Sequence, residues 1–240
     1  EKVFKHRDFG KAVANTLLLN VLDLLFSFPM PIILALLLNE IRVKWFKRVT
    51  QTLLYLPHFL SWVVIGATAY AMFATNSGVI NTLIANAGKS PIPFLQEDAW
   101  WLFSYILIGI WQTMGWGTII YLAAITNVNS ELYEAAKVDG ANRWQQCLHV
   151  TLPCIRSTIV VMLIMQLGKL MGGSFERIVA LSNAKATEYT TTIPVLVFKW
   201  FQGNKFSEST ALGLFQSVIG VILVVASDKI AKKLGEDGLL

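Results

Sequence analysis

The sequence predicts an all-α integral membrane protein, and its composition carries this prediction. Hydrophobic residues make up 55% of the 240 residues and charged residues only 15%, with a mean hydropathy of +0.55. A soluble domain is normally more charged and less apolar. The chain also has 8 Trp, 6 Tyr and 14 Phe, and amphipathic rings settle at membrane–water boundaries. The net charge of +5 comes from scattered basic residues, which indicates lipid headgroups rather than nucleic acid as their partner.

Five stretches are long and apolar enough to cross a membrane, since a spanning helix needs about 20 mostly apolar residues for roughly 30 Å of hydrocarbon. They cover residues 12–38, 50–73, 100–125, 154–171 and 211–227. No repeat with a period of roughly 20–50 residues is present, and the segments between the spans have the character of loops. The chain is therefore expected to be a single membrane domain, residues 1–240.

Helix-breaking residues lie inside three of the predicted spans. Such residues are tolerated in a membrane where neighbouring helices satisfy the freed backbone groups. The three spans are therefore predicted to pack against other helices at Pro29, Pro31, Pro57, Gly109, Gly115 and Gly117.

The distribution of charge indicates which side of the membrane each loop faces. The longer loop 74–99 has one basic residue, Lys89, whereas the short loop 40–49 has four, Arg42, Lys44, Lys47 and Arg48. Short loops rich in Lys and Arg stay in the cytoplasm, so loop 40–49 is predicted to be cytoplasmic. With this orientation, the numbers of basic residues on the two sides of the membrane are nearly equal. The basic residues that it places outside are Lys2, Lys5, Arg7, Lys11, Arg177, Lys185, Lys199 and Lys205.

Residues 127–153 form a polar insert between the third and fourth spans, on the predicted cytoplasmic side. The run 127–130, Asn-Val-Asn-Ser, supplies side chains that cap the start of a helix. Glu131 and Glu134 then fall in the first turn of that helix, where negative charge complements the helix dipole. A short surface helix is therefore predicted here.

A corner and a second helix are expected to follow. Gly140 is predicted to end the first helix in a left-handed conformation, which glycine adopts without steric cost. Residues 141–150 begin the second helix, which Pro153 ends or bends. Ala135 and Ala136 leave a low-relief face on the first helix that can fit into a groove of a partner.

The insert also carries a sequence motif. Its residues 134–140 read Glu-Ala-Ala-Lys-Val-Asp-Gly, and residues 150–153 read Val-Thr-Leu-Pro. This spacing resembles the EAA motif, E-A-A-x3-G-x9-I-x-L-P, in the permease subunits of binding-protein-dependent type I ABC importers, with Val150 in the Ile position. In that family the motif is the cytoplasmic coupling loop on which an ATPase subunit pushes. The resemblance implies that the coupling residues are Glu134, Ala135, Ala136, Asp139, Gly140, Leu152 and Pro153.

The resemblance extends over essentially the whole chain. Residues 31–40, 55–62 and 232–238 are similar to the branch of these permeases that imports sugars, and within it to the subgroup for complex oligosaccharides. Full-length members have six spans with cytoplasmic coupling helices, so an additional amino-terminal span is expected to be missing from this chain. The polar run 166–173 departs from the family, where a more neutral sequence is expected.

What the family implies is a heteromeric importer in a bacterial inner membrane. This chain would associate with a second, different permease, with two ATP-binding cassette ATPase subunits and with an extracytoplasmic solute-binding protein. ATP and Mg would be used by the ATPase subunits, and this chain would bind no cofactor. Transport would follow alternating access, in which the ligand has unequal affinity for two states. The alternative is a secondary transporter or channel that works without an ATPase.

Asp23 and Lys169 are ionisable residues within the predicted spans, where such groups are costly and usually functional. Asp23 could pair with a neighbouring span or with the missing one. Lys169 lies near the outer end of the fourth span, one turn after Gln166 on the same face. Lys169 could line the substrate pathway, pair with Asp23, or extend its ammonium to the headgroups.

The third span offers a complementary surface. Gln112 and Trp116 lie four residues apart and therefore on one helix face. Aromatic rings stack on the apolar faces of sugars and amides bind their hydroxyl groups, although helix packing would explain the same pattern. With Gln166 and the cation Lys169, this face predicts an oligosaccharide that bears carboxylates, such as a uronate.

Other reactive residues do not form a recognisable site. Cys147 and Cys154 flank a proline and have no suitable neighbours for a metal, so they are expected to be free thiols in a reducing compartment. His6, His58 and His149 are far apart in the sequence. Neither a phosphate-binding loop nor a hydrolase motif is present, so the chain is not expected to be an enzyme.

Overall fold

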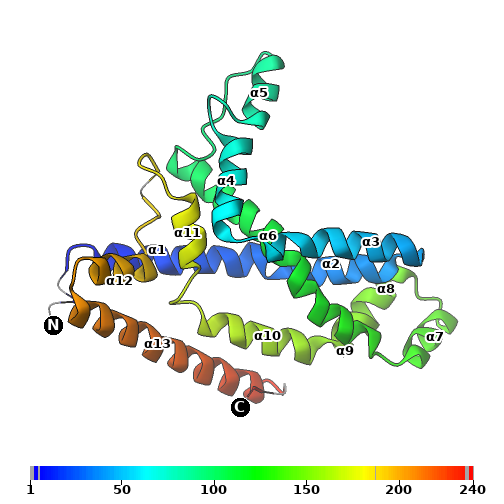
Figure 1. Cartoon of the computed structure of the whole chain (residues 1–240). Coiled ribbons are helices and arrows are strands. Elements are labelled where there is room, and N and C mark those ends of the chain that lie inside the picture. The colour runs from blue at the N-terminus through cyan, green and yellow to red at the C-terminus, as the bar shows by residue number, and fades with distance from the viewer. Residues whose placement is uncertain (1–2, 5, 187, 236–237, 240) are drawn as a thin grey trace.

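The computed structural model describes residues 3–239 except residues 5, 187, 236 and 237. Over these residues the chain consists of helices and connecting loops without a strand, which confirms the all-α prediction (Figure 1). Lys2 and Lys5, which were counted on the outer side, lie outside the described residues, as do Glu236 and Asp237 of the closing segment.

The first predicted span is one continuous helical run, Phe9–Glu40, of 32 residues. It comprises α1 (Phe9–Leu22), a π-helical turn (Asp23–Ser27) and α2 (Pro29–Glu40). Both prolines of this span lie in the first turn of α2, where a missing N–H is least costly. The π-turn directly before them closes through a hydrogen bond from the N–H of Phe28 to the carbonyl of Asp23, 3.0 Å long.

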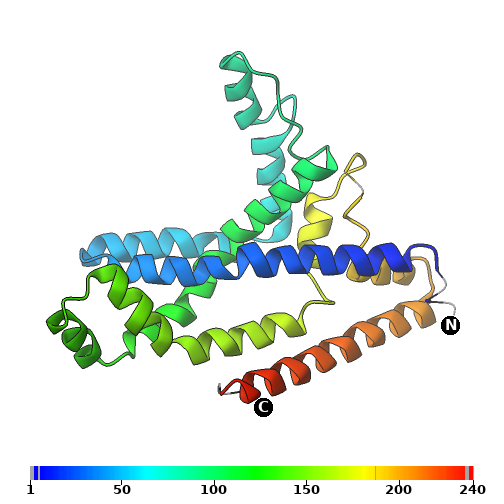
Figure 2. The ribbon, with the colours of Figure 1, turned by 180° about the vertical axis from the view of Figure 1, so that it is seen from behind.

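The second predicted span is broken. It comprises α3 (Lys44–Tyr55), a 3₁₀ turn (Leu56–Phe59) that contains Pro57, and α4 (Trp62–Phe73). The two parts differ in direction by 104°. The helix α4 and the short α5 (Val79–Asn86) form an arm that projects away from the other helices (Figures 1 and 2).

The third span is α6 (Asp98–Thr126), 29 residues long, and it is the helix against which α2 and α3 pack. Small residues on α6 permit this close approach. A Cβ at Gly115 would overlap the backbone carbonyl of Leu54, and a Cβ at Gly117 would crowd the ring of Pro31. The prediction that these glycines face other helices is therefore confirmed.

The carboxyl-terminal half supplies the remaining helices. Between α6 and the fourth span lie α7 (Ser130–Val138), α8 (Arg143–Gln146), a π-turn (Cys147–Thr151) and α9 (Leu152–Cys154). After them come α10 (Arg156–Gly168), α11 (Phe175–Leu181), α12 (Ile193–Gln202) and α13 (Phe206–Lys233), with α10 and α12 packed against α13. The fourth span was predicted as 154–171, but α10 ends at Gly168, where the N–H groups of Lys169 and Leu170 bond carbonyls three residues back instead of four.

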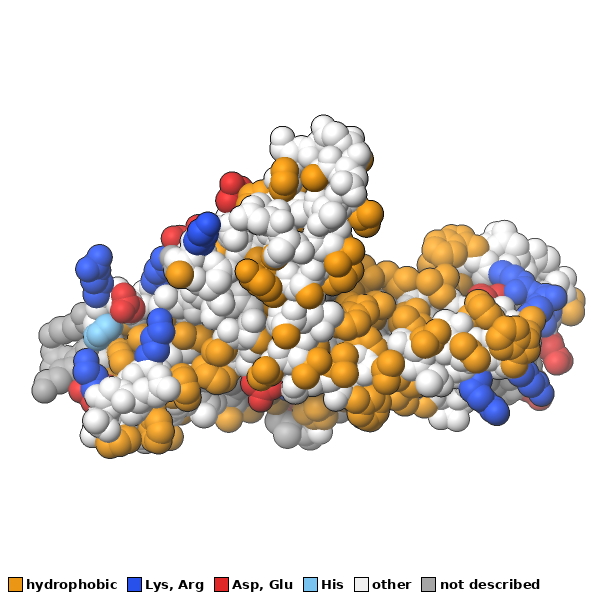
Figure 3. Space-filling model, turned by 45° about the horizontal axis from the view of Figure 1, so that its top comes forward, with side chains coloured by type: hydrophobic (Ala, Val, Ile, Leu, Met, Phe, Trp, Pro, Cys, Tyr) orange, Lys and Arg blue, Asp and Glu red, His pale blue; other side chains and the backbone are white. Residues whose placement is uncertain are grey.

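The surface of the protein has separate charged and hydrophobic regions, as a membrane protein requires. Lys and Arg side chains gather at the two ends of the long body, and hydrophobic side chains dominate between them (Figure 3). Leu214, Val218 and Ile222 of α13 are more than half exposed, which a lipid environment explains. Three helices of the described chain are long and apolar enough to span a membrane, and five spans result if each bent pair counts as one.

The contact between α6 and α3 yields a prediction about stability. We expect Gly115→Ala to destabilise the protein by about 1–3 kcal/mol, because the added methyl group must push a backbone carbonyl away. Gly213→Ala on α13 is the matched control, since nothing lies within 4 Å of a Cβ there. Thermal unfolding of the purified protein in detergent measures both, and equal midpoints would contradict the close approach.

Candidate functional site

A cavity of about 1070 Å³, with polar side chains set in a largely apolar wall, lies among the helices. Its walls come from the first span, the 3₁₀ turn, α6, the end of α10 and α13. The four residues predicted to face the substrate pathway all line it: Gln112, Trp116, Gln166 and Lys169. Residues from two different spans are thus brought to one cavity.

The wall at α6 is aromatic as well as polar. Gln112 is buried, and the ring of Trp116 stacks on His58, with centroids 4.7 Å apart and planes inclined by 5°. The Nδ1 atom of His58 is buried without a hydrogen-bond partner in the described part of the chain. His58 was not predicted to belong to this site; it lies in the 3₁₀ turn that interrupts the second span, and it lines the cavity.

The opposite wall contains the end of α10. Lys169 is the residue directly after this helix, and its N–H bonds the carbonyl of Gln166 at 3.1 Å. A cation at this position is favoured by the helix dipole. The ammonium of Lys169 has no hydrogen-bond or ion-pair partner among the described residues. Of the roles predicted for Lys169, a pair with Asp23 is wrong, because Asp23 has another partner.

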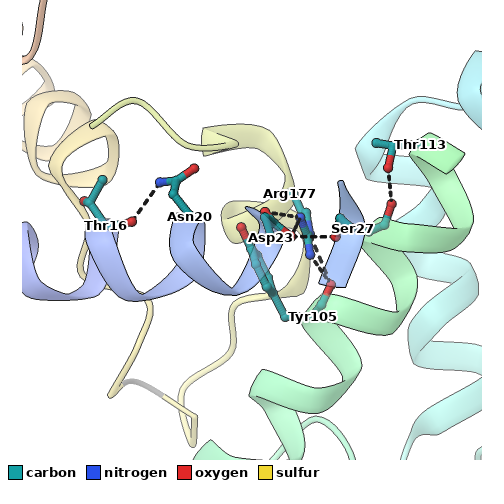
Figure 4. A network of polar contacts seen from close by, with 8 residues as sticks. Thr16, Asn20, Asp23, Ser27, Tyr105, Thr113 and Arg177 are labelled. Atoms are coloured by element: carbon teal, nitrogen blue, oxygen red, sulfur yellow. Dashed lines mark hydrogen bonds and ion pairs between the residues drawn. The ribbon is translucent and has the colours of Figure 1, made fainter. Parts of the chain in front are cut away.

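That partner is Arg177 of α11, which binds Asp23 with distances of 2.9 and 3.1 Å from one guanidinium nitrogen (Figure 4). The Nε atom of Arg177 donates to the carbonyl of Tyr105 at 3.1 Å, and its other terminal nitrogen donates to the same oxygen. The guanidinium carbon lies 3.5 Å from the centroid of the Tyr105 ring. The hydroxyl of Ser27 donates to Asp23 at 3.0 Å.

This arrangement corrects the charge count made from the sequence. Arg177 was placed on the outer side with the loop cations, but it is only 4% exposed. A buried guanidinium is stable when a carboxylate and backbone carbonyls satisfy its donors, as here. One signal for this was present, since Arg177 is a single cation within the otherwise mostly apolar run 175–181.

The second candidate site is the two-helix loop, where α7 is capped as predicted. The side chain of Asn129 accepts a hydrogen bond from the N–H of Glu131 at 3.0 Å. At the other end Gly140 has φ of 78°, which confirms the predicted left-handed corner. The N–H of Gly140 bonds Lys137 at 3.0 Å and that of Ala141 bonds Ala136 at 2.8 Å, the pair of bonds that defines a Schellman motif.

The second helix begins and ends slightly later than predicted. It starts at Arg143, where Asn142 and Gln145 form a capping box. The helical run passes through Pro153 and ends at Cys154, and the π-turn before it closes with a bond from the N–H of Leu152 to the carbonyl of Cys147. The bend predicted at Pro153 follows directly. The chain bends by 62° only between Arg143–Cys154 and α10.

The loop presents a surface suited to a partner. Glu134, Ala135, Asp139 and Gly140 are exposed, Ala136 is half-buried, and Glu134 has no partner in the described part of the chain. Pro153 is exposed, whereas Leu152 packs into a hydrophobic cluster with the spans. The loop also exposes the apolar side chains Leu132, Val138 and Trp144, which sequence reasoning missed. Val138 is 87% exposed, so its side chain contributes little to the packing of this chain.

Comparisons with known proteins identify the family of the chain. A family model described as "Binding-protein-dependent transport system inner membrane component" matches residues 27–234. The chain therefore belongs to this family, the permeases of ABC importers. It is a transport subunit rather than an enzyme, and a multi-pass membrane protein.

Curated relatives and solved structures match almost the whole chain. The polygalacturonan/rhamnogalacturonan transport system permease protein YteP of Bacillus subtilis is 44% identical over 99% of this chain and 74% of its own length. Protein LplB of the same organism is 42% identical over 98% of this chain and 74% of its own length. A chain of a bacterial alginate ABC transporter, solved with an alginate pentasaccharide-bound periplasmic protein, has a TM-score of 0.95 and 36% identity, covering 99% of this chain and 83% of that one.

The corner at Gly140 yields a prediction about local stability. We expect Gly140→Val to weaken the end of α7 by about 1 kcal/mol or more, because a branched side chain is strained at positive φ. The backbone amide hydrogens at positions 140 and 141 would then exchange with solvent about fivefold faster or more. Gly140→Asn is the control, since Asn tolerates this conformation. Equal exchange rates in the Val variant and the wild type would contradict the motif.

Proposed function

We propose that this chain forms part of the pore through which an ATP-driven importer moves an acidic oligosaccharide across a bacterial inner membrane. The observation that carries this proposal is the unpaired ammonium of Lys169 in a cavity with Gln112, Gln166 and Trp116. An unpaired cation is costly at membrane depth unless an anion reaches it. Amide groups and an aromatic ring beside it suit the hydroxyls and apolar faces of a sugar chain.

The names of similar proteins support an acidic cargo. One relative is a permease of a polygalacturonan/rhamnogalacturonan transport system. A solved structure with a TM-score of 0.92 and 37% identity belongs to an importer of the acidic polysaccharide alginate. We extend this class of cargo to the present chain because its cavity contains the cation and hydrogen-bonding groups that a sugar carboxylate requires.

The assembly that we propose contains a second, different permease, two ATPase subunits and a solute-binding protein outside the membrane. The exposed apolar residues of the loop support docking of an ATPase at residues 130–153. The alginate transporter that resembles this chain was solved with a periplasmic protein. ATP and Mg would act in the ATPase subunits, whose closure moves the loop and turns the cavity from one side of the membrane to the other.

Glu134 provides the test of coupling. We expect Glu134→Lys to abolish substrate-stimulated ATP hydrolysis by the reconstituted importer, because it reverses the charge of an exposed, unpaired carboxylate on the docking face. Glu97→Lys, an exposed carboxylate at the far end of α6, is the matched control and should hydrolyse ATP normally. Normal stimulation in the Glu134 variant would exclude this docking mode, and uptake without ATP would indicate a secondary transporter.

Lys169 provides the test of cargo. We expect Lys169→Met to raise the KM for an acidic oligosaccharide about tenfold or more, because a charge-assisted hydrogen bond is lost. The KM for a neutral oligosaccharide of equal length should change little. Uptake into proteoliposomes that contain the assembled importer measures both. If the two cargoes are affected equally, or neither is affected, Lys169 does not recognise the charge of the substrate.

A further inference from the structure

The cavity wall contains one carboxylate and two cations, Asp23, Lys169 and Arg177. They differ in what surrounds them. Lys169 is exposed and unpaired among the described residues, whereas Arg177 is buried and paired with Asp23. Both cations could attract an anionic cargo by charge alone, so the difference in their environment decides which of them a cargo can bind.

Each nitrogen of the Arg177 guanidinium already has an acceptor. One terminal nitrogen donates to both oxygens of Asp23, and the other donors are directed at the carbonyl of Tyr105. The face of the guanidinium lies on the Tyr105 ring. Gly109 provides the space on α6, since a Cβ there would overlap the guanidinium. A cargo carboxylate could therefore reach Arg177 only if it replaced Asp23.

Asp23 is held firmly against replacement. Its carboxylate accepts a third hydrogen bond from Ser27, and both residues belong to the π-turn that interrupts the first span. An ordinary α-helix would rotate successive side chains differently, so this turn fixes where the carboxylate points. The side chain of Asp23 is 14% exposed, and therefore part of it remains at the cavity surface.

We propose that Asp23 is a specificity-determining residue that masks Arg177, so that Lys169 alone binds the carboxylates of the cargo. This inference rests on the proposed function. A transport cavity must hold its cargo strongly enough to select it and weakly enough to release it. Two accessible cations would hold an anionic sugar chain more tightly than one and would slow its release. The masked pair thus keeps the cavity selective for acidic cargo without trapping it.

Asp23→Asn in the assembled importer is the test. We expect the KM for an acidic oligosaccharide to fall about tenfold, since a charge-assisted hydrogen bond to Arg177 becomes available. The maximal uptake rate of the same cargo should fall as well, because release becomes slower, while a neutral oligosaccharide keeps its wild-type KM. The double variant Asp23→Asn with Arg177→Gln removes both charges and should restore the wild-type ratio of acidic to neutral KM.

The outcomes separate this inference from the proposed function. If Lys169→Met affects acidic cargo selectively but Asp23→Asn changes both cargoes equally, the pair is only a structural anchor and the masking idea is overturned. If Lys169→Met has no selective effect, the acidic-cargo proposal itself fails. Should Asp23→Asn not assemble, Ser27→Ala decides, because it removes only the hydrogen bond that holds Asp23 from its own turn. A ratio of acidic to neutral KM below that of the wild type supports masking, and an unchanged ratio overturns it.

Discussion

The satisfaction of backbone hydrogen bonds in hydrocarbon is the constraint that determines where the helices of this protein are interrupted. Lipid supplies no donors or acceptors, so irregular backbone is tolerated only where protein or water covers it. The π-turn Asp23–Ser27, the 3₁₀ turn Leu56–Phe59 and the glycine-containing segment after α10 all contribute residues to the cavity wall. The cavity and these three breaks are therefore related: each break would be costly if it faced lipid, and each places a polar side chain in the cavity wall.

The buried ion pair of Asp23 and Arg177 joins the first span, α6 and α11. Arg177 bonds the π-turn of the first span and the backbone of α6 at Tyr105, and α11 is fastened at its other end by a bond of 2.8 Å from Trp101 to the carbonyl of Leu181. The short helix α11 is also held by hydrophobic packing, since Ile178 and Leu181 belong to the same core cluster as Ile65 of α4. Removing one partner of such a pair leaves the other charge buried and uncompensated. The free energy that this costs is much larger than the net free energy that the intact pair contributes to stability.

Much of this architecture could be predicted from the sequence, because the signals are local. Length and hydropathy are sufficient to locate apolar spans, and caps and glycines are sufficient to predict the corner at Gly140. The partner of Asp23 could not be predicted, because Arg177 lies 154 residues away in a segment that resembles an outer loop. The break near Pro57 was visible, but its angle of 104° depends on the packing of α4 against α11. His58 was missed for the same reason, since only this angle turns it toward Trp116.

The position of the loop in the chain explains how a force applied to it would act on the cavity. Residues 127–153 connect α6, which carries Gln112 and Trp116, to α10, which ends at Gln166 and Lys169. The base of the loop is not free to move alone, because Leu152 packs into the same hydrophobic cluster as Tyr121, and Tyr121 also lines the cavity. Arg143 is further joined to Glu40 at the end of the first span by an ion pair of 2.7 Å. Close-packed interiors transmit displacement rather than absorb it. A shift of the loop under the proposed function would therefore move the two walls that bind the sugar relative to each other, which is the change that converts a binding cavity into a releasing one.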